Sequence, residues 1–180
     1  MTVITFYGAD QMTELTIRPI KKSDLDKMSC TFKSEFGRTH ADDLHDQSLF
    51  NISFFVAWLN GNPVGHALVR WLGPREETVR KDYPYCPEIY RVRVLKEFRS
   101  QGIATAIIKE CENEASNRHC LLIGLGTHLD ITSKDNLYIR LGYEPSTVGN
   151  YIDTYKTRSD NGAVATIRKE AQFLIKRIGN

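Results

Sequence analysis

The feature that most constrains this chain is a strand, a turn and a long amphipathic helix in direct succession. Residues 89–94 (Ile-Tyr-Arg-Val-Arg-Val) have the β-branched and aromatic composition of a strand. A helix is predicted from about Gly102 to Asn117, and its apolar residues recur four apart on one face: Ile103, Ile107, Cys111 and Ala115. Such a helix must bury this face against the sheet that contains the strand.

Six other segments are predicted to be strands. They are residues 13–19, 52–59, 64–72, 121–125, 151–157 and 172–178. Helices are expected from about residue 23 and over residues 133–141, and residues 39–47 form either a short helix or a loop. Asn60 and Gly61 are typical of a hairpin turn between two of the strands. Strands that first pair locally and then alternate with helices predict a mixed sheet covered by helices.

The length and composition are typical of one soluble globular domain. The chain has 180 residues, of which 41% are hydrophobic and 26% are charged. Regular patterning begins at residue 13, so we expect residues 1–12 to be a loosely attached extension and residues 13–180 to form a single domain. The longest apolar run, residues 52–59, is about half the length that a membrane-spanning helix needs, so no membrane is expected.

Charge and cysteine usage argue against several function classes. Lys and Arg number 24 against 22 for Asp and Glu, and this formal net charge of +2 does not suggest a nucleic-acid-binding surface. The four cysteines include no Cys-x-x-Cys pair, and with no recognisable secretory signal they predict reduced thiols in a cytoplasmic protein. The five histidines lack zinc-ligand spacing, so no metal is predicted. The expected partner is a small molecule or a defined protein site.

Residues 99–104 (Arg-Ser-Gln-Gly-Ile-Ala) are the candidate phosphate-binding segment. The first turn of the following helix has unpaired amides and the positive end of the helix dipole. Gly102 lacks a Cβ, so its backbone can approach an anion closely, and Arg99 and Gln101 can donate from the rim. The alternative is a plain corner between a strand and a helix. The segment has neither the lysine of a Walker motif nor the three spaced glycines of a dinucleotide site.

These six residues resemble the Arg/Gln-x-x-Gly-x-Gly/Ala signature of the GNAT superfamily of N-acetyltransferases. As in that family, they stand between a valine-rich strand and a helix. Two further segments follow the family order: Ile17-Arg-Pro-Ile20 resembles its usual first strand, and Tyr138-Ile-Arg-Leu-Gly-Tyr143 resembles its late Tyr-x-x-Leu-Gly-Phe/Tyr segment. The likeness extends from about residue 13 through nearly the whole chain.

The resemblance implies an α+β fold, with a mostly antiparallel mixed sheet of about six to seven strands flanked by helices. It also implies that the acetyl group of acetyl-CoA, a co-substrate, passes to a primary amine of a small molecule or protein by direct attack in a ternary complex. The pyrophosphate would contact the backbone of Arg99, Ser100, Gln101, Gly102, Ile103 and Ala104. The pantetheine would lie along Val92, Arg93 and Val94, with Asn136 as a further contact.

Catalysis of this kind requires a base for the amine and an acid for the departing thiolate. Glu88 matches the position of the catalytic Glu in the histone-acetyltransferase branch and is the first candidate base, the alternative being a solvated Glu after Pro87. His128 is the second candidate, and a water relay to either residue would also serve. Tyr138 resembles the general-acid Tyr of the family, the alternative being a core aromatic residue, whereas Tyr143 is predicted to pack.

By the same resemblance, the acceptor pocket is built from about residues 32–47 and 151–161. Four acidic residues of the first segment would favour a cationic amine, unless they form only a solvated face: Glu35, Asp42, Asp43 and Asp46. A polyamine, an aminoglycoside-like compound, a free amino acid and a protein N-terminus or lysine are all candidate acceptors. A non-catalytic acyl-CoA sensor or scaffold is the first alternative function, and a modifier of aminoacyl-tRNA is the second. The last hairpin is a candidate homodimer interface.

Overall fold

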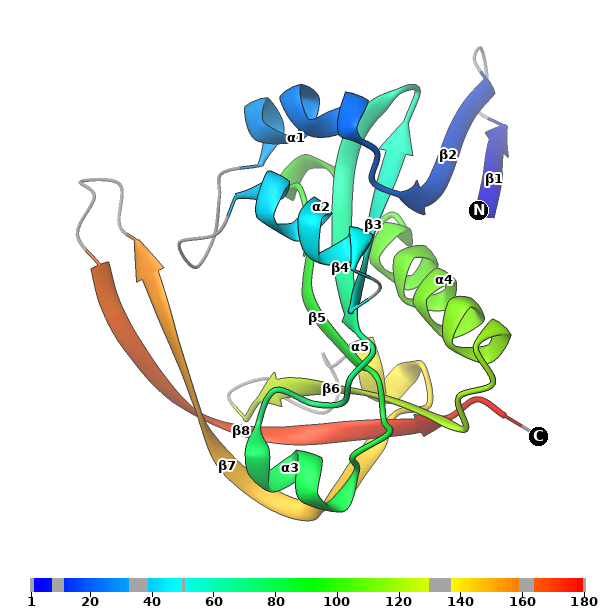
Figure 1. Cartoon of the computed structure of the whole chain (residues 1–180). Helices are drawn as coiled ribbons and strands as arrows, with labels where there is room; N and C mark the ends of the chain where they lie inside the picture. The colour runs from blue at the N-terminus through cyan, green and yellow to red at the C-terminus, as the bar shows by residue number, and fades with distance from the viewer. Residues whose placement is uncertain are drawn as a thin grey trace.

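An open sheet of eight strands forms the centre of the fold, with helices on both of its faces (Figure 1). The computed structural model describes residues 2–7, 12–32, 39–49, 51–129, 137–158 and 164–179. Its strands are β1 (Thr2–Tyr7), β2 (Met12–Pro19), β3 (Ile52–Leu59), β4 (Asn62–Arg70), β5 (Glu88–Val94), β6 (Leu122–His128), β7 (Glu144–Arg158) and β8 (Val164–Arg177). They lie in the order β1-β2-β3-β4-β5-β6-β8-β7, in which β5 and β6 are parallel and the other neighbours are antiparallel. The predicted α+β fold with a mostly antiparallel mixed sheet is confirmed.

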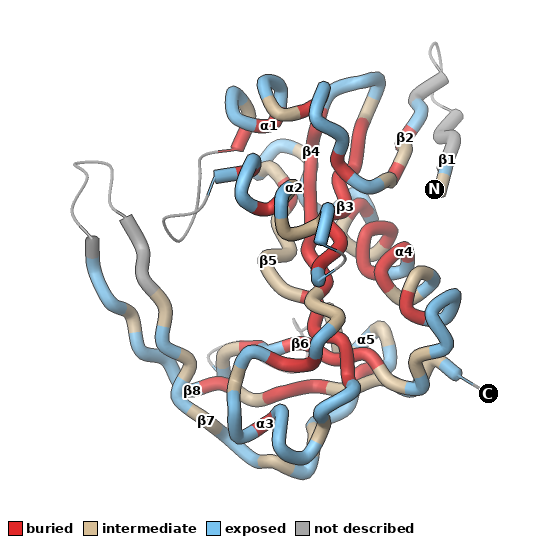
Figure 2. Tube along the Cα trace, in the orientation of Figure 1, coloured by how far each residue is buried: buried red, intermediate tan, exposed pale blue. Residues whose placement is uncertain are grey.

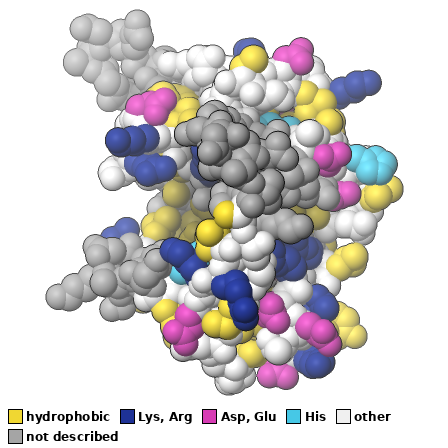
Figure 3. All heavy atoms as spheres, turned by 90° about the vertical axis from the view of Figure 1, so that its left-hand side faces the viewer, with side chains coloured by type: hydrophobic (Ala, Val, Ile, Leu, Met, Phe, Trp, Pro, Cys, Tyr) yellow, Lys and Arg dark blue, Asp and Glu magenta, His cyan; other side chains and the backbone are white. Residues whose placement is uncertain are grey.

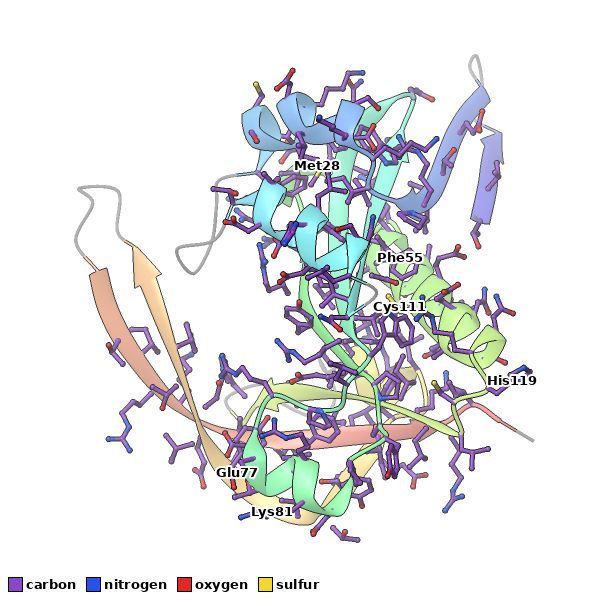
Figure 4. All side chains as sticks on the ribbon, viewed as in Figure 1. Met28, Phe55, Glu77, Lys81, Cys111 and His119 are labelled. Atoms are coloured by element: carbon purple, nitrogen blue, oxygen red, sulfur yellow. The ribbon has the colours of Figure 1, made fainter. Side chains whose placement is uncertain are left out.

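The longer helices divide between the two faces of the sheet. Helices α1 (Leu25–Thr31) and α2 (His40–Ser48) cover one face, and α4 (Ile103–Asn117) covers the other (Figures 1 and 2). Side chains alternate along β3, so Phe54 packs with Met28 of α1, whereas Phe55 packs with Cys111 of α4 (Figure 4). The short elements are α3 (Glu77–Asp82), α5 (Leu137–Arg140) and the 3-10 turns Lys22–Asp24 and Lys96–Phe98. None of the helices in the described part of the chain is long and apolar enough to cross a bilayer.

Two elements were not predicted from the sequence. Residues 2–7, which were assigned to the extension, form β1 at the sheet edge and raise the strand count from about six or seven to eight. Residues 3–7 (Val-Ile-Thr-Phe-Tyr) have the β-branched and aromatic composition of a strand, but composition alone does not show that the segment pairs with β2. Helix α3 lies in the predicted loop after β4, where its one turn and a half buries Val79 and is spanned by an ion pair of 3.2 Å between Glu77 and Lys81 (Figure 4).

One turn and one helix agree with the residues that the sequence offers for them. Asn60 and Gly61 have φ angles of 49° and 76°, so the predicted hairpin turn between β3 and β4 is confirmed. Residues 39–47, left open as helix or loop, form most of α2, and the Thr39 hydroxyl accepts a hydrogen bond from the Asp42 N–H at 3.2 Å. The helix predicted over residues 133–141 appears as α5 in its later part, and residues 133–136 lie outside the described residues.

The last two strands extend beyond the rest of the sheet. The ladder between β6 and β8 ends at the pair His128–Ala171, and from there to the end of the described hairpin β8 pairs with β7 alone. Strands β7 and β8 therefore continue as a two-stranded ribbon that projects from the body (Figure 1). The outer part of β7 agrees with the strand predicted over residues 151–157, whereas residues 144–150 of β7 and 164–171 of β8 were not predicted to be strand. Most of the side chains described in these two segments are at least partly exposed, so the segments lack the apolar alternation by which strands are recognised.

His66 of β4 is buried among aromatic rings on the face that α1 and α2 cover. Its ring centroid lies 4.8 Å from that of Phe32 and 5.6 Å from that of Phe54. Burial, with the nearby charge of Arg91, lowers the pKa of His66 from 6.5 to about 3. The unfolded chain therefore binds a proton that the folded chain does not. The free energy of unfolding is expected to fall as the pH decreases from about 6.5 toward 3, by at most about 1.4 kcal/mol per pH unit.

Urea unfolding at pH 7, 6 and 5 measures this contribution. The substitution His66→Leu replaces the imidazole by an apolar side chain of similar size, and it is expected to flatten the pH dependence of the unfolding free energy. The exposed His45 of α2 provides a matched control, since His45→Gln should leave the dependence as steep as in the wild type. An equally steep dependence in His66→Leu would contradict the assignment of this buried imidazole.

Candidate active site

Strands β5 and β6 diverge shortly after they begin to pair. Their parallel ladder contains two residue pairs, of which Ile89 with Leu125 is the second. A β-bulge then turns β5 aside: Arg91 and Val92 face the single residue Ala67 of β4, and Arg91 has a φ of 53°. The later part of β5, which is predicted to carry the pantetheine, continues along β4 and away from β6.

The turn that follows β5 leads into α4 through two residues with positive φ. Ser100 has a φ of 60° and Gly102, the first residue before the helix, has a φ of 80°. A Cβ added to Gly102 would meet no heavy atom within 4 Å, so the described structure leaves room beside its backbone. No side chain caps α4, and its first turn contains no acidic residue. The start of α4 therefore combines uncapped amides with the positive end of the helix dipole, which suits an anion.

The side chains of this turn partly brace the turn itself. Arg99 Nε donates to the Val94 carbonyl at 3.1 Å, and Gln101 Nε2 donates to a carbonyl of the preceding 3-10 turn at 3.2 Å. Ile103 is buried and Ala104 packs against the same core. Any ligand at this turn would therefore contact mainly the backbone of the predicted segment.

A cleft of about 540 Å³ lies between α2, β5, β6 and β7. Both segments predicted to form the acceptor pocket contribute to its walls: Asp43 and Asp46 come from α2, and Tyr151, Asp153 and Tyr155 come from β7. The two candidate bases, Glu88 of β5 and His128 of β6, line the same cleft. The fold thus brings together residues that are more than a hundred positions apart in the sequence.

Glu88 is held by two donors at the base of the cleft. Its Oε2 forms an ion pair with Arg70 and accepts a hydrogen bond from the Arg75 N–H at 2.9 Å. The Arg70 guanidinium also lies over the Tyr90 ring, 4.4 Å from its centroid. Burial raises the pKa of the Glu88 carboxyl above its ordinary value, although Arg70 and the Arg75 amide act in the opposite direction. The carboxylate is therefore positioned, desolvated and more basic than a surface Glu.

His128 lies across the cleft as part of a second group of polar side chains. Its Nε2 is 3.2 Å from Asp153 Oδ2, and its ring is stacked on Tyr155 with the centroids 5.8 Å apart. The other oxygen of Asp153, Oδ1, accepts a hydrogen bond from Arg75 Nη2 at 2.5 Å. Arg75 therefore contacts both Glu88, through its backbone, and Asp153, through its side chain.

A sequence profile of the acetyltransferase (GNAT) family matches residues 20–143, more than half of the chain. The chain belongs to the GNAT acetyltransferase family. The match spans both cleft-lining strands β5 and β6, the turn before α4 and the segment that contains Tyr138.

Solved structures of N-acetyltransferases share the fold of this GNAT domain. The N-acetyltransferase from Staphylococcus aureus Mu50 has a TM-score of 0.65 and 17% sequence identity, with 91% of this chain and 98% of that chain covered. Arabidopsis thaliana NAA60 in complex with acetyl-CoA has a TM-score of 0.65 and 18% identity, with the same shares covered. The ribosomal-protein-S18-alanine N-acetyltransferase from Escherichia coli has a TM-score of 0.61 and 15% identity, with 92% of this chain and 95% of that chain covered. At these identities, the likeness shows a shared fold.

The four acidic residues predicted to form one cluster have different roles in the GNAT domain. Asp42 closes the capping box of α2, because its Oδ2 accepts from the Thr39 N–H at 2.7 Å. Asp43 is 1% exposed and forms an ion pair of 2.7 Å with Arg91 at the bulge of β5. Asp46 lines the cleft, and Glu35 lies outside the described residues. The expected acidic surface is therefore reduced, since one carboxylate is a cap and another is neutralised.

Tyr138 lies in α5, and the described lining of the cleft does not include it. Burial raises the pKa of its hydroxyl above the ordinary value. Its ring packs edge-on against that of Tyr143, with the centroids 6.2 Å apart, and Tyr143 is 1% exposed in the core. Asn136, the predicted further contact to pantetheine, lies outside the described residues.

Sequence patterns missed the contacts of Arg75, Asp153 and Arg91. Arg75 precedes α3 in a segment for which no helix or strand was predicted, and Asp153 lay in a predicted strand and pocket segment without being singled out. Their partnership spans 78 positions of the chain and joins segments that are not neighbours in the sheet. Among the residues that the structure describes, no group of three or more His, Cys, Asp or Glu side chains is arranged to hold a metal ion.

Proposed function

We propose that this GNAT domain is an N-acetyltransferase that transfers the acetyl group of acetyl-CoA to a primary amine. The observation that carries the proposal is the course of β5, which begins in the cleft at Glu88 and ends at the turn before α4. A ligand with an anionic group on that turn can extend along β5 into the cleft. The pyrophosphate, pantetheine and thioester of acetyl-CoA follow one another in this order.

The residues present fit such a co-substrate. The backbone of Arg99 to Ala104 would bind the pyrophosphate, where Gly102 leaves room and no side chain caps the helix. The backbone of Val92 to Val94 would pair with the pantetheine in the place that β6 gives up by diverging, and Asn136 is retained as a proposed contact. Acetyl-CoA supplies the acetyl group as a thioester, and the same compound is present in the Arabidopsis NAA60 complex.

The proposed chemistry transfers two protons, one from the attacking amine and one to the departing sulfur. The amine nitrogen forms a bond to the acetyl carbon, and the bond between that carbon and sulfur breaks. Glu88, directly or through a water molecule, receives the proton that the amine loses, and Tyr138 gives its hydroxyl proton to the departing sulfur. Burial raises the pKa of the Glu88 carboxyl, which makes the carboxylate more basic, and the Tyr138 hydroxyl is protonated at neutral pH even at the ordinary tyrosine pKa of about 10.

The charge of the cleft supports a cationic acceptor. Its described lining contains five carboxylates, from Asp43, Asp46, Glu76, Glu88 and Asp153, and three guanidinium groups, from Arg70, Arg75 and Arg91. Figure 3 shows acidic and basic side chains interspersed over the described surface on the side from which the ribbon projects. The excess of carboxylates in the described lining of the cleft favours a small or narrow amine over a polyanion.

Release of coenzyme A tests the proposed function. Purified protein with acetyl-CoA would be assayed against a polyamine, an aminoglycoside, free amino acids, peptides with a free N-terminus or lysine, and bulk aminoacyl-tRNA. We expect amine-dependent release of the thiol with at least one amine and none with aminoacyl-tRNA. Binding of acetyl-CoA without release above background for any acceptor would instead favour a non-catalytic sensor or scaffold.

Glu88→Gln is expected to lower kcat by about a hundredfold or more, as for loss of a general base. The amide cannot accept the proton of the amine, but it keeps the shape of the carboxyl group. The affinity for acetyl-CoA, measured by calorimetry, should stay within about threefold of wild type, because the proposed binding surface begins beyond the bulge.

Arg70→Gln and His128→Gln are the matched variants. Arg70→Gln breaks the same ion pair but keeps the carboxylate, so it should retain much more of kcat than Glu88→Gln. If the two variants lose equal activity, Glu88 has only a structural role. If kcat falls only in His128→Gln, the proton acceptor is the His128 imidazole and not Glu88.

A further inference from the structure

Arg75 connects two walls of the cleft. On one side its N–H donates to Glu88 Oε2 at 2.9 Å. On the other side its Nη2 donates to Asp153 Oδ1 at 2.5 Å and to the Thr154 carbonyl at 3.2 Å. The contacts therefore join the start of β5 to the outer part of β7, two strands that are not neighbours in the sheet.

The wall that Arg75 holds is the outer part of β7, which within the described part of the chain has β8 as its only strand neighbour. Asp153 pairs with Lys169 of β8, two positions beyond Ala171, where the ladder between β6 and β8 ends. One further backbone contact, from the Leu129 N–H to the Glu170 carbonyl at 3.1 Å, lies just beyond that pair. From there outward the wall is the two-stranded ribbon, and a two-stranded hairpin alone is only marginally stable in water. Asp153 and Tyr155 of this ribbon also contact His128, so the position of the ribbon decides where the imidazole lies.

We propose that Arg75 is a positioning residue of the acceptor site, which holds the β7 wall and the His128–Asp153 pair at a fixed distance from Glu88. This inference rests on the proposed function and deepens it, because it names the residue that sets the width of the amine pocket. Arg75 acts through Asp153 and is not itself a catalytic residue.

The contacts favour positioning over a contribution to global stability. The Arg75 side chain is 52% exposed and that of Asp153 is 23% exposed, and ion pairs as exposed as this one contribute little to the free energy of folding. The guanidinium nevertheless has two acceptors on consecutive residues of β7, which fixes its direction. A link of this kind restricts the ribbon while leaving the core unaffected.

The substitution Arg75→Gln is expected to raise the KM for the amine by about ten- to hundredfold, since a displaced wall misplaces the acceptor. The dissociation constant of acetyl-CoA should not change. Arg75→Lys should recover part of the loss, because an ammonium group can also donate to the Asp153 carboxylate but lacks the planar, rigid guanidinium. Arg118→Gln is the matched control, because it removes another partly exposed ion pair, of 2.9 Å with Glu114, at the end of α4 and outside the described lining of the cleft.

A double-mutant cycle and hydrogen exchange separate positioning from a general defect. If Arg75 acts through Asp153, then Arg75→Gln with Asp153→Asn should have an amine KM no higher than the worse single variant. Amides 151–155 should exchange about tenfold faster in Arg75→Gln than in Arg118→Gln, while those of β3 and β4 stay unchanged. The exchange measurement needs no acceptor.

An unchanged amine KM, additive effects in the cycle or unchanged exchange would each overturn the role of Arg75. These results leave the proposed function intact if the wild type binds acetyl-CoA and acetylates an amine. If the wild type neither binds acetyl-CoA nor acetylates an amine, the proposed function itself is overturned. In that case hydrogen exchange still tests the link between Arg75 and Asp153, and unchanged exchange in Arg75→Gln would contradict it.

Discussion

Gly102→Val is expected to weaken the binding of acetyl-CoA by about a hundredfold, close to 2.7 kcal/mol. Gly102 has a φ of 80° at the start of α4, and its missing Cβ leaves open space where the pyrophosphate is proposed to lie. Valine would place two methyl groups in that space and would also strain the backbone by about 1–3 kcal/mol. Isothermal titration calorimetry with acetyl-CoA measures the combined effect.

Gly61→Val separates ligand exclusion from backbone strain. Gly61, in the turn between β3 and β4, has a φ of 76°, and a Cβ there also meets no heavy atom within 4 Å. Both variants should lose similar stability to urea, but only Gly102→Val should lose affinity for acetyl-CoA. Equal affinities in the two variants would show that the start of α4 is not the pyrophosphate site.

Tyr138→Phe is expected to lower kcat by about a hundredfold, the lower end of the range for a general acid, with acetyl-CoA affinity within about threefold of wild type. A tyrosine hydroxyl has an ordinary pKa of about 10 and burial raises that of Tyr138, so the group is protonated at neutral pH. Phenylalanine keeps the edge-on packing with Tyr143 and removes only the oxygen. Steady-state rates at saturating acetyl-CoA and amine report the change.

Tyr143→Phe is the natural comparison, because it removes a buried hydroxyl from the neighbouring ring. This variant should retain the wild-type kcat, with at most a modest change in the free energy of unfolding. A rate for Tyr138→Phe that equals the wild-type rate would make Tyr138 another core aromatic residue. The departing thiolate would then obtain its proton from water.

The elements that local sequence predicts well are those with a strong signal of their own. The helix α4 has apolar residues four apart, and Asn60 with Gly61 fits the left-handed turn that the hairpin requires. Helix α3 escaped prediction because it has six residues with one buried. Strand β1 was assigned to the extension although residues 3–7 have a strand-like composition, because composition alone does not show that this segment pairs with β2. Residues 144–150 of β7 and 164–171 of β8 escaped because most of their described side chains are at least partly exposed.

In the candidate site, too, local sequence identifies some residues, while other contacts depend on the tertiary fold. The turn with Gly102 could be proposed as an anion site from its six residues, because such binding depends on the local backbone. Glu88 and His128 were identified separately, and nothing in the sequence indicated that Arg75 and Asp153 link them. These contacts join segments that are not neighbours in the sheet, and the bulge at Arg91 is likewise a property of strand pairing. The shape of the cleft therefore depends on tertiary contacts that local sequence patterns do not reveal.

The account depends on binding of a diphosphate by the backbone of residues 99–104, which amide chemical-shift mapping tests most directly. Coenzyme A added to ¹⁵N-labelled protein should shift the amides of Gly102, Ile103 and Ala104 and those of residues 92–94. Pantetheine alone should affect only residues 92–94. Saturable shifts at both segments would agree with the account, whereas no shift with coenzyme A, or shifts elsewhere on the molecule, would contradict it.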